Sequence, residues 1–102
     1  MLKDLAYYEN LIRTAILEQL PQQDYDVFLF GSRATGTNKQ WSDFDVGILG
    51  KDEQTIPSTV RYEIETELDR LNVPFIVDLV DFSLVEDKFK KVAMQDRVLW
   101  TK

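Results

Sequence analysis

Residues 30–48 read FGSRATGTNKQWSDFDVGI, and the two ends of this segment decide the fold. The apolar run over 25–30 (YDVFLF) is rich in aromatic and β-branched residues and stops at Gly31, which predicts a buried strand that ends in a turn. Residues 43–49 (DFDVGIL) alternate between polar and apolar, which predicts a second strand, half buried. A polar loop over 35–40 connects the two strands.

Long helices are predicted on either side of these strands. Apolar residues recur every three or four positions until Pro21 stops the pattern, which predicts a first helix over about 3–20. Pro57 stands early in a run whose apolar residues keep helical spacing as far as Leu71. Because proline is tolerated in the first turn of a helix, this run predicts a second long helix.

A third strand and a final helix are predicted at the C-terminal end. Residues 75–82 (FIVDLVDF) are apolar on both faces except for Asp78 and Asp81, which predicts a strand with two polar positions to explain. Ser83 and Glu86 have the spacing of a capping box, which predicts that the last helix opens there.

The order of these elements predicts one small α+β domain. Helix, strand, loop, strand, helix, strand and helix describe a mixed sheet with helices packed largely on one face. A chain of 102 residues has room for one core, so we expect a single domain over 1–102.

The composition excludes several classes of function and site. Twelve Lys and Arg against eighteen Asp and Glu give a net charge of −6, which disfavours binding to long nucleic acid. The chain has no cysteine and no histidine, so any metal must be held by oxygen, as suits Mg²⁺, Mn²⁺ or Ca²⁺. No window is apolar enough to span a membrane and the first residues lack a signal-peptide layout, so we expect a cytoplasmic protein.

The end of the first strand has the features of an anion site. Gly31 lets a ligand approach the main chain, and Ser32 adds a hydroxyl at the start of a helical turn with free amides. Arg33 has two interpretations, a contact with a nucleotide phosphate or a cap on the turn.

Carboxylates are predicted to gather on the sheet. Asp43 and Asp45 alternate along a strand and point to the same face, where their repulsion is best explained by a divalent cation between them. In the alternative interpretation, Asp43 and Asp45 only form the polar face of an edge strand. Asp78 is positioned as a third oxygen ligand, whereas Asp81, three residues on, faces the opposite side.

These residues are the components of two-metal phosphoryl or nucleotidyl transfer, with Asp78 as the carboxylate that takes the place of a histidine base. In the loop, Lys39 and Trp41 are expected to shape or solvate the chain. Gly47 either loosens the second strand or gives a ligand more room.

The motifs resemble the nucleotidyltransferase superfamily of DNA polymerase beta, whose signature is Gly-Ser, a spacer, Asp-x-Asp and a third carboxylate on a later strand. Here the signature reads Gly31-Ser32, ten residues, then Asp43-Phe44-Asp45. The LFGSRATG opening and the VDLVD segment look most like the minimal nucleotidyltransferases, the MNT-domain proteins. The resemblance covers nearly the whole chain, and the final helix is its least diagnostic part.

The resemblance implies a small nucleotidyltransferase fold and a Mg²⁺-dependent transfer of AMP from ATP to an acceptor hydroxyl. It implies that Asp43 and Asp45 bind two Mg²⁺ or Mn²⁺ ions, that Asp78 completes one site and assists the acceptor, and that Gly31 and Ser32 hold the β- and γ-phosphates. It also implies that this chain is the antitoxin of a HEPN/MNT toxin-antitoxin pair, and that the acceptor is a tyrosine of the HEPN toxin. The toxin's own motif uses Arg and His, so a chain without histidine cannot be the toxin half.

Two other functions stay open at this point. One is a non-catalytic nucleotide-binding antitoxin that blocks its partner by contact, although clustered carboxylates without a metal would only cost stability. The other is a small-molecule nucleotidyltransferase of the aminoglycoside-modifying type, against which the missing second domain weighs. For the transferase that the resemblance implies, 102 residues leave no room for an acceptor-binding domain, so the acceptor site would come from a partner or from a second copy of the chain.

Overall fold

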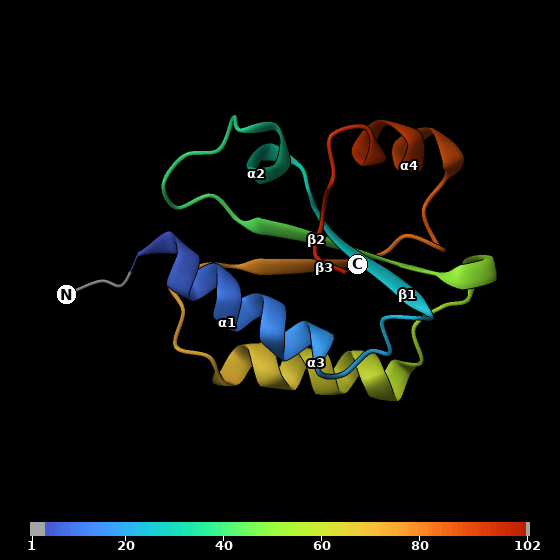
Figure 1. The fold of residues 1–102 in the computed structure, drawn as a ribbon, viewed down its shortest axis with the longest axis horizontal. Coiled ribbons are helices and arrows are strands. Elements are labelled where there is room, and N and C mark those ends of the chain that lie inside the picture. The colour runs from blue at the N-terminus through green and yellow to red at the C-terminus, as the bar shows by residue number, and fades with distance from the viewer. Residues whose placement is uncertain (1–3, 102) are drawn as a thin grey trace.

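The computed structural model describes residues 4–101 of the chain (Figure 1). Its helices and strands follow one another in an order that matches the sequence prediction, with a short helix and a short strand added. In chain order they are α1 (Leu5–Leu17), β1 (Tyr25–Phe30), α2 (Ser32–Thr35), β2 (Phe44–Gly50), a 3-10 turn (Lys51–Glu53), α3 (Ser58–Arg70), β3 (Val77–Asp81), α4 (Asp87–Met94) and β4 (Val98–Leu99).

The strands form one mixed sheet in the order β3-β2-β1-β4. Strands β1 and β2 are antiparallel, whereas β2 and β3 are parallel because α3 carries the chain back across the sheet between them. Strand β4 pairs antiparallel with β1 at the other edge. The predicted fold class, a small mixed α+β sheet, is confirmed.

Both faces of the sheet are covered, by helices of different size (Figure 1). The long helices α1 and α3 lie together on one face and enclose the main core there, so the expectation that helices pack largely on one face holds for these two and not for the C-terminal helix. On the other face lie α2 and α4, which are shorter. The main core is apolar and includes Ile12, Ile16, Val27, Phe44, Val46, Ile48 and Ile64, each of which is fully buried.

A second, aromatic cluster lies under α4. The rings of Phe28, Phe30 and Phe82 pack edge to face or tilted, with centroids 4.9 to 6.3 Å apart. Gly47 lies beneath them in β2, where a Cβ would overlap the rings of Phe28 and Phe82. Of the two roles expected for this glycine, more room for a ligand is wrong, because the space that a side chain would need is filled by aromatic rings.

The start of the last helix corrects the sequence prediction. Helix α4 begins at Asp87 with Glu86 as its N-cap, so Ser83 is not part of a capping box. The Ser83 amide and hydroxyl donate instead to Asp81 Oδ1, at 3.1 and 2.6 Å. A buried carboxylate on the preceding strand thus competes successfully for the serine.

The first helix is shorter than predicted, since it ends at Leu17. Its predicted start at position 3 lies outside the described residues, and Asp4 caps the helix by accepting a 3.0 Å hydrogen bond from the Tyr7 amide. Every helix among residues 4–101 is too short or too polar to cross a membrane.

Candidate active site

Gly31 ends β1 in a backbone conformation that other residues rarely adopt. Its φ is +74°, and its carbonyl accepts hydrogen bonds of 3.1 Å from the amides of Ala34 and Thr35. This turn opens α2, so the amides of Ser32 and Arg33 stand at a helix start where no intrahelical acceptor is available. The predicted anion-binding features are therefore together in one turn.

Asp45 lies directly against this turn. A Cβ on Gly31 would overlap the Asp45 carboxylate, so the glycine gives the room that the acid occupies. In the sheet Asp45 pairs with Phe30 of β1 on one side and with Asp78 of β3 on the other. The central strand thus places one carboxylate between the glycine turn and a second carboxylate.

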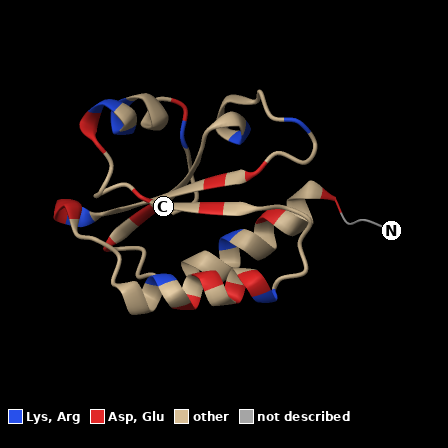
Figure 2. Ribbon diagram, turned by 180° about the vertical axis from the view of Figure 1, so that it is seen from behind, with Lys and Arg blue, Asp and Glu red and all other residues tan. Residues whose placement is uncertain are grey.

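The predicted acidic residues share the face of the sheet that carries α2 and α4. Asp45 and Asp78 are cross-strand neighbours in a parallel pair, and the acidic bands of β2 and β3 lie side by side in Figure 2. Asp43 comes two residues before Asp45 and is exposed just before β2. Side chains two residues apart in extended backbone point to the same side.

The electrostatics of Asp45 reflect this crowding. Its pKa is raised above the ordinary value, first because burial disfavours the charged form and then because of the negative charges of Asp78 and Asp43. A divalent cation bound between these oxygens would remove the repulsion, so the donor chemistry fits a hard cation such as Mg²⁺. Within residues 4–101, however, no three acidic side chains already converge as the ligands of one ion.

Arg33 is engaged within the chain. Its Nε and Nη2 donate to the carbonyl of Ser42 at 3.0 and 2.8 Å, and Nη2 also donates to the carbonyl of Gln40 at 3.2 Å. The guanidinium lies 4.2 Å from the ring centroid of Phe44, and burial lowers its pKa while Glu9 and Asp43 act in the opposite direction. In this arrangement Arg33 holds the loop that leads into Asp43.

The loop itself is ordered by local contacts. The Lys39 amide donates to Ser42 Oγ at 2.8 Å, and the ring of Trp41, half exposed, lies 5.6 Å from the ring of Phe75. The backbone of Lys39 and the ring of Trp41 thus contribute to the shape of the loop.

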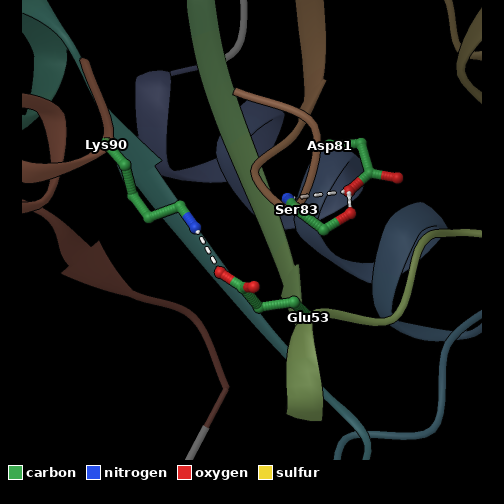
Figure 3. A network of polar contacts seen from close by, with 4 residues as sticks. All are labelled: Glu53, Asp81, Ser83 and Lys90. Carbon is green, nitrogen blue, oxygen red and sulfur yellow. Dashed lines mark hydrogen bonds and ion pairs between the residues drawn. The ribbon is translucent and has the colours of Figure 1, made fainter. Parts of the chain in front are cut away.

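Asp81 and Asp78 have different surroundings, although both are acids of β3. Asp81 is 7% exposed and accepts hydrogen bonds from the Ile56 amide at 2.9 Å and from the backbone and hydroxyl of Ser83 (Figure 3). Asp78 is exposed on the face of the candidate site. Asp81 thus fastens the loop before α3, whereas Asp78 is available to a ligand.

A groove between α2 and α4 adjoins the glycine turn, and sequence reasoning missed it. Its volume is about 300 Å³. Phe30, Gly31 and Thr35 line one wall, and Phe89, Val92 and Ala93 line the other. The apolar spacing of residues 89, 92 and 93 was visible in the sequence, but the groove depends on where α4 docks. An ion pair of 3.0 Å between Lys90 and Glu53 helps to hold that helix (Figure 3).

The comparisons with known proteins agree with this geometry. The profile of the Nucleotidyltransferase domain family matches residues 10–100, which include every candidate site residue. The chain belongs to this family. The nucleotidyltransferase signature seen in the sequence is thereby confirmed as a family relationship.

Two relatives are more specific. The nucleotidyltransferase is 32% identical over 89 residues to a Haemophilus influenzae protein named probable protein adenylyltransferase MntA, a match that covers 87% of this chain and 75% of the relative. A chain in a crystal structure described as a toxin-antitoxin with AMP-PNP superposes with a TM-score of 0.68 at 25% identity, covering 90% of this chain and 71% of that one. Both relatives agree with the predicted resemblance to MNT antitoxins.

The contrast between Asp81 and Asp78 gives a matched pair of variants. Asp81→Ala leaves the Ile56 and Ser83 donors without their acceptor, so we expect the free energy of unfolding to fall by about 1–3 kcal/mol or more. Asp78→Ala removes an exposed acid and should leave stability unchanged or slightly higher. Urea denaturation of both variants measures the difference, and equal losses would contradict the distinct roles of the two acids.

The raised pKa of Asp45 makes the stability of the metal-free protein depend on pH. The folded state binds the proton of the Asp45 carboxyl group more tightly than the unfolded state does. The free energy of unfolding therefore falls as the pH rises from the ordinary pKa of 3.8 through the raised pKa. We therefore expect Asp45→Asn to raise the melting temperature at pH 7 in EDTA, with a gain that shrinks as the pH approaches that ordinary value. A gain that does not change with pH, or a loss at pH 7, would contradict this electrostatic account.

Proposed function

We propose that this nucleotidyltransferase transfers AMP from ATP to a hydroxyl of a partner protein, and that the acceptor is a tyrosine of a HEPN-type toxin. The observation that carries the proposal is the position of Asp45, between the Gly31 turn and Asp78. The similarity to a probable protein adenylyltransferase and to a toxin-antitoxin chain supports the protein acceptor.

Nucleotide binding begins at the turn after β1. The amides of Ser32 and Arg33 and the Ser32 hydroxyl would hold the β- and γ-phosphates, because a helix start offers free N–H donors to an anion. Gly31 keeps this turn close to Asp45, so the α-phosphate would come to lie against the carboxylates. Arg33 supports the site by fixing the loop that ends at Asp43.

Asp43, Asp45 and Asp78 would hold two Mg²⁺ ions, for which Mn²⁺ is a chemical substitute. When bound, the ions neutralise phosphate charge and favour the ionised form of the acceptor hydroxyl. The crowded carboxylates support this assignment, because the pKa of Asp45 is raised first by burial and then by the negative charges of Asp78 and Asp43.

The transfer step needs a group that takes the acceptor's proton. The acceptor oxygen forms a bond to the α-phosphorus as the bond from that phosphorus to the bridging oxygen breaks, and pyrophosphate leaves. Asp78 is exposed, so its carboxylate would receive the proton from the hydroxyl. The protein's main contribution is to orient the reactants and to balance charge.

The partner must bring its hydroxyl to an open face. Asp78 lies on β3, at the edge of the sheet, and is exposed, so an acceptor held in line there needs a further wall. A toxin partner would supply that wall together with the acceptor. The net charge of −6 favours association with a basic surface, such as one that binds RNA.

The experiment that tests the proposal is intact-mass spectrometry of the toxin partner. The product of the neighbouring gene, which the proposal takes to be the HEPN-type toxin, is co-expressed with this protein, and the purified complex is incubated with ATP and Mg²⁺. We expect mass additions of one AMP each on the partner, which EDTA prevents and Asp43→Asn reduces at least about a hundredfold. Glu63→Gln, on the exposed face of α3, is the matched acidic control and should leave the addition unchanged.

Each contrary outcome has a distinct meaning. A stable complex that shows no mass addition would reject catalysis on the partner and favour inhibition by contact. An addition that survives Asp43→Asn would reject the assignment of the carboxylates, and no association at all would reject the partner.

A further inference from the structure

The groove between α2 and α4 shares a wall with the candidate phosphate site. Gly31 and Thr35 belong to the turn and helix at which the phosphates would bind, and both line the groove. Its volume of about 300 Å³ is at the lower end of the range for small-molecule sites, about 300–1,000 Å³. The nucleobase of a nucleotide whose phosphates are bound at the Gly31 turn is a small group that such a groove could hold.

We infer that this groove binds the base of the nucleoside triphosphate, with the Phe89 ring as its stacking surface. The inference rests on the proposed function, because it assumes that the phosphates bind at the Gly31 turn. It adds a base-binding site to that function and names the residues that form it.

Phe89 is held in place from below. Its ring meets Phe30 edge on at 6.2 Å and lies tilted against Phe82 at 5.9 Å, so the aromatic cluster fixes its orientation. The side chain nevertheless stays 44% exposed. A fixed aromatic ring that is open on one side can stack on a base with little loss of side-chain entropy.

Val92 extends the same surface. It follows Phe89 by one helical turn, lines the groove and is 66% exposed. A base lying on Phe89 would cover this apolar surface, which otherwise faces water.

The rim of the groove carries polar groups that can read a base edge. Gln95 and Asp96 line the groove at the end of α4. A glutamine amide both donates and accepts, which matches the ring nitrogen and amino group of adenine, and a carboxylate accepts from an amino group. This combination favours adenine over a base that has a carbonyl in place of the amino group.

Calorimetry with two ligands tests the inference in the full chain. MgATP and magnesium tripolyphosphate share the phosphates, but only ATP has a base. We expect Phe89→Ala to weaken ATP binding roughly tenfold, the loss typical of a missing base–aromatic stack, and to leave tripolyphosphate binding unchanged. Tyr62→Ala is the matched control, because that tyrosine is 71% exposed on α3, which covers the opposite face of the sheet.

A second variant guards against a folding defect in Phe89→Ala. Val92→Gln changes an exposed position, so it should keep the melting temperature while it weakens ATP and spares tripolyphosphate. Inosine triphosphate, which lacks the amino group, should bind wild-type protein more weakly than ATP, and Asp96→Ala should reduce that preference.

The outcomes distinguish a failure of the base site from a failure of the proposed function. If wild-type protein binds both ligands and folded Phe89→Ala and Val92→Gln bind ATP as tightly, the base site is wrong while the phosphate site stands. If wild-type protein binds neither ligand in the presence of Mg²⁺, the proposed function fails and the base site with it. Equal losses for ATP and tripolyphosphate would also overturn the inference, because they would show a general effect on the site.

Discussion

The contact between the Asp45 carboxylate and the backbone of Gly31 is the constraint on which the site depends. A side chain at position 31 would be strained by the positive φ there, which favours glycine, and its Cβ would displace that carboxylate. The close approach puts free amides and a carboxylate at one end of β1 and β2. Donors for phosphate and ligands for a cation are thus supplied by neighbouring strands.

The sheet keeps this arrangement in place at an electrostatic cost. The parallel pairing of β2 and β3 aligns Asp45 with Asp78, and the pKa of Asp45 is raised first by burial and then by this repulsion. Packing on both faces of the sheet offsets this unfavourable electrostatic free energy: the main core lies on one face and the aromatic rings beside Gly47 lie on the other. Clustered like charges that locally destabilise the fold are common at sites that bind a ligand.

The sequence was most informative where short-range pattern and chemistry coincide. The end of β1 at Phe30 and the alternation around Asp45 were predictable, because strand period and glycine turns are local properties. Features that depend on tertiary contacts were not. Ser83 has the spacing of a capping box but donates a hydrogen bond to Asp81. Arg33 donates to carbonyls of a loop whose path the sequence does not specify. The two residues of β4 are too few to show the alternation that predicts a strand.

The central claim is that the glycine turn, the Asp-x-Asp strand and β3 form one cation-nucleotide site. Its most direct test is paramagnetic broadening of backbone amide signals by substoichiometric Mn²⁺, in the presence of a non-hydrolysable ATP analogue. We predict that signals of residues 31–33, 43–46 and 77–79 broaden together, because one site lies next to all three segments. Broadening over the acidic helix segment 63–69 instead, or over just one of the three segments, would contradict the account.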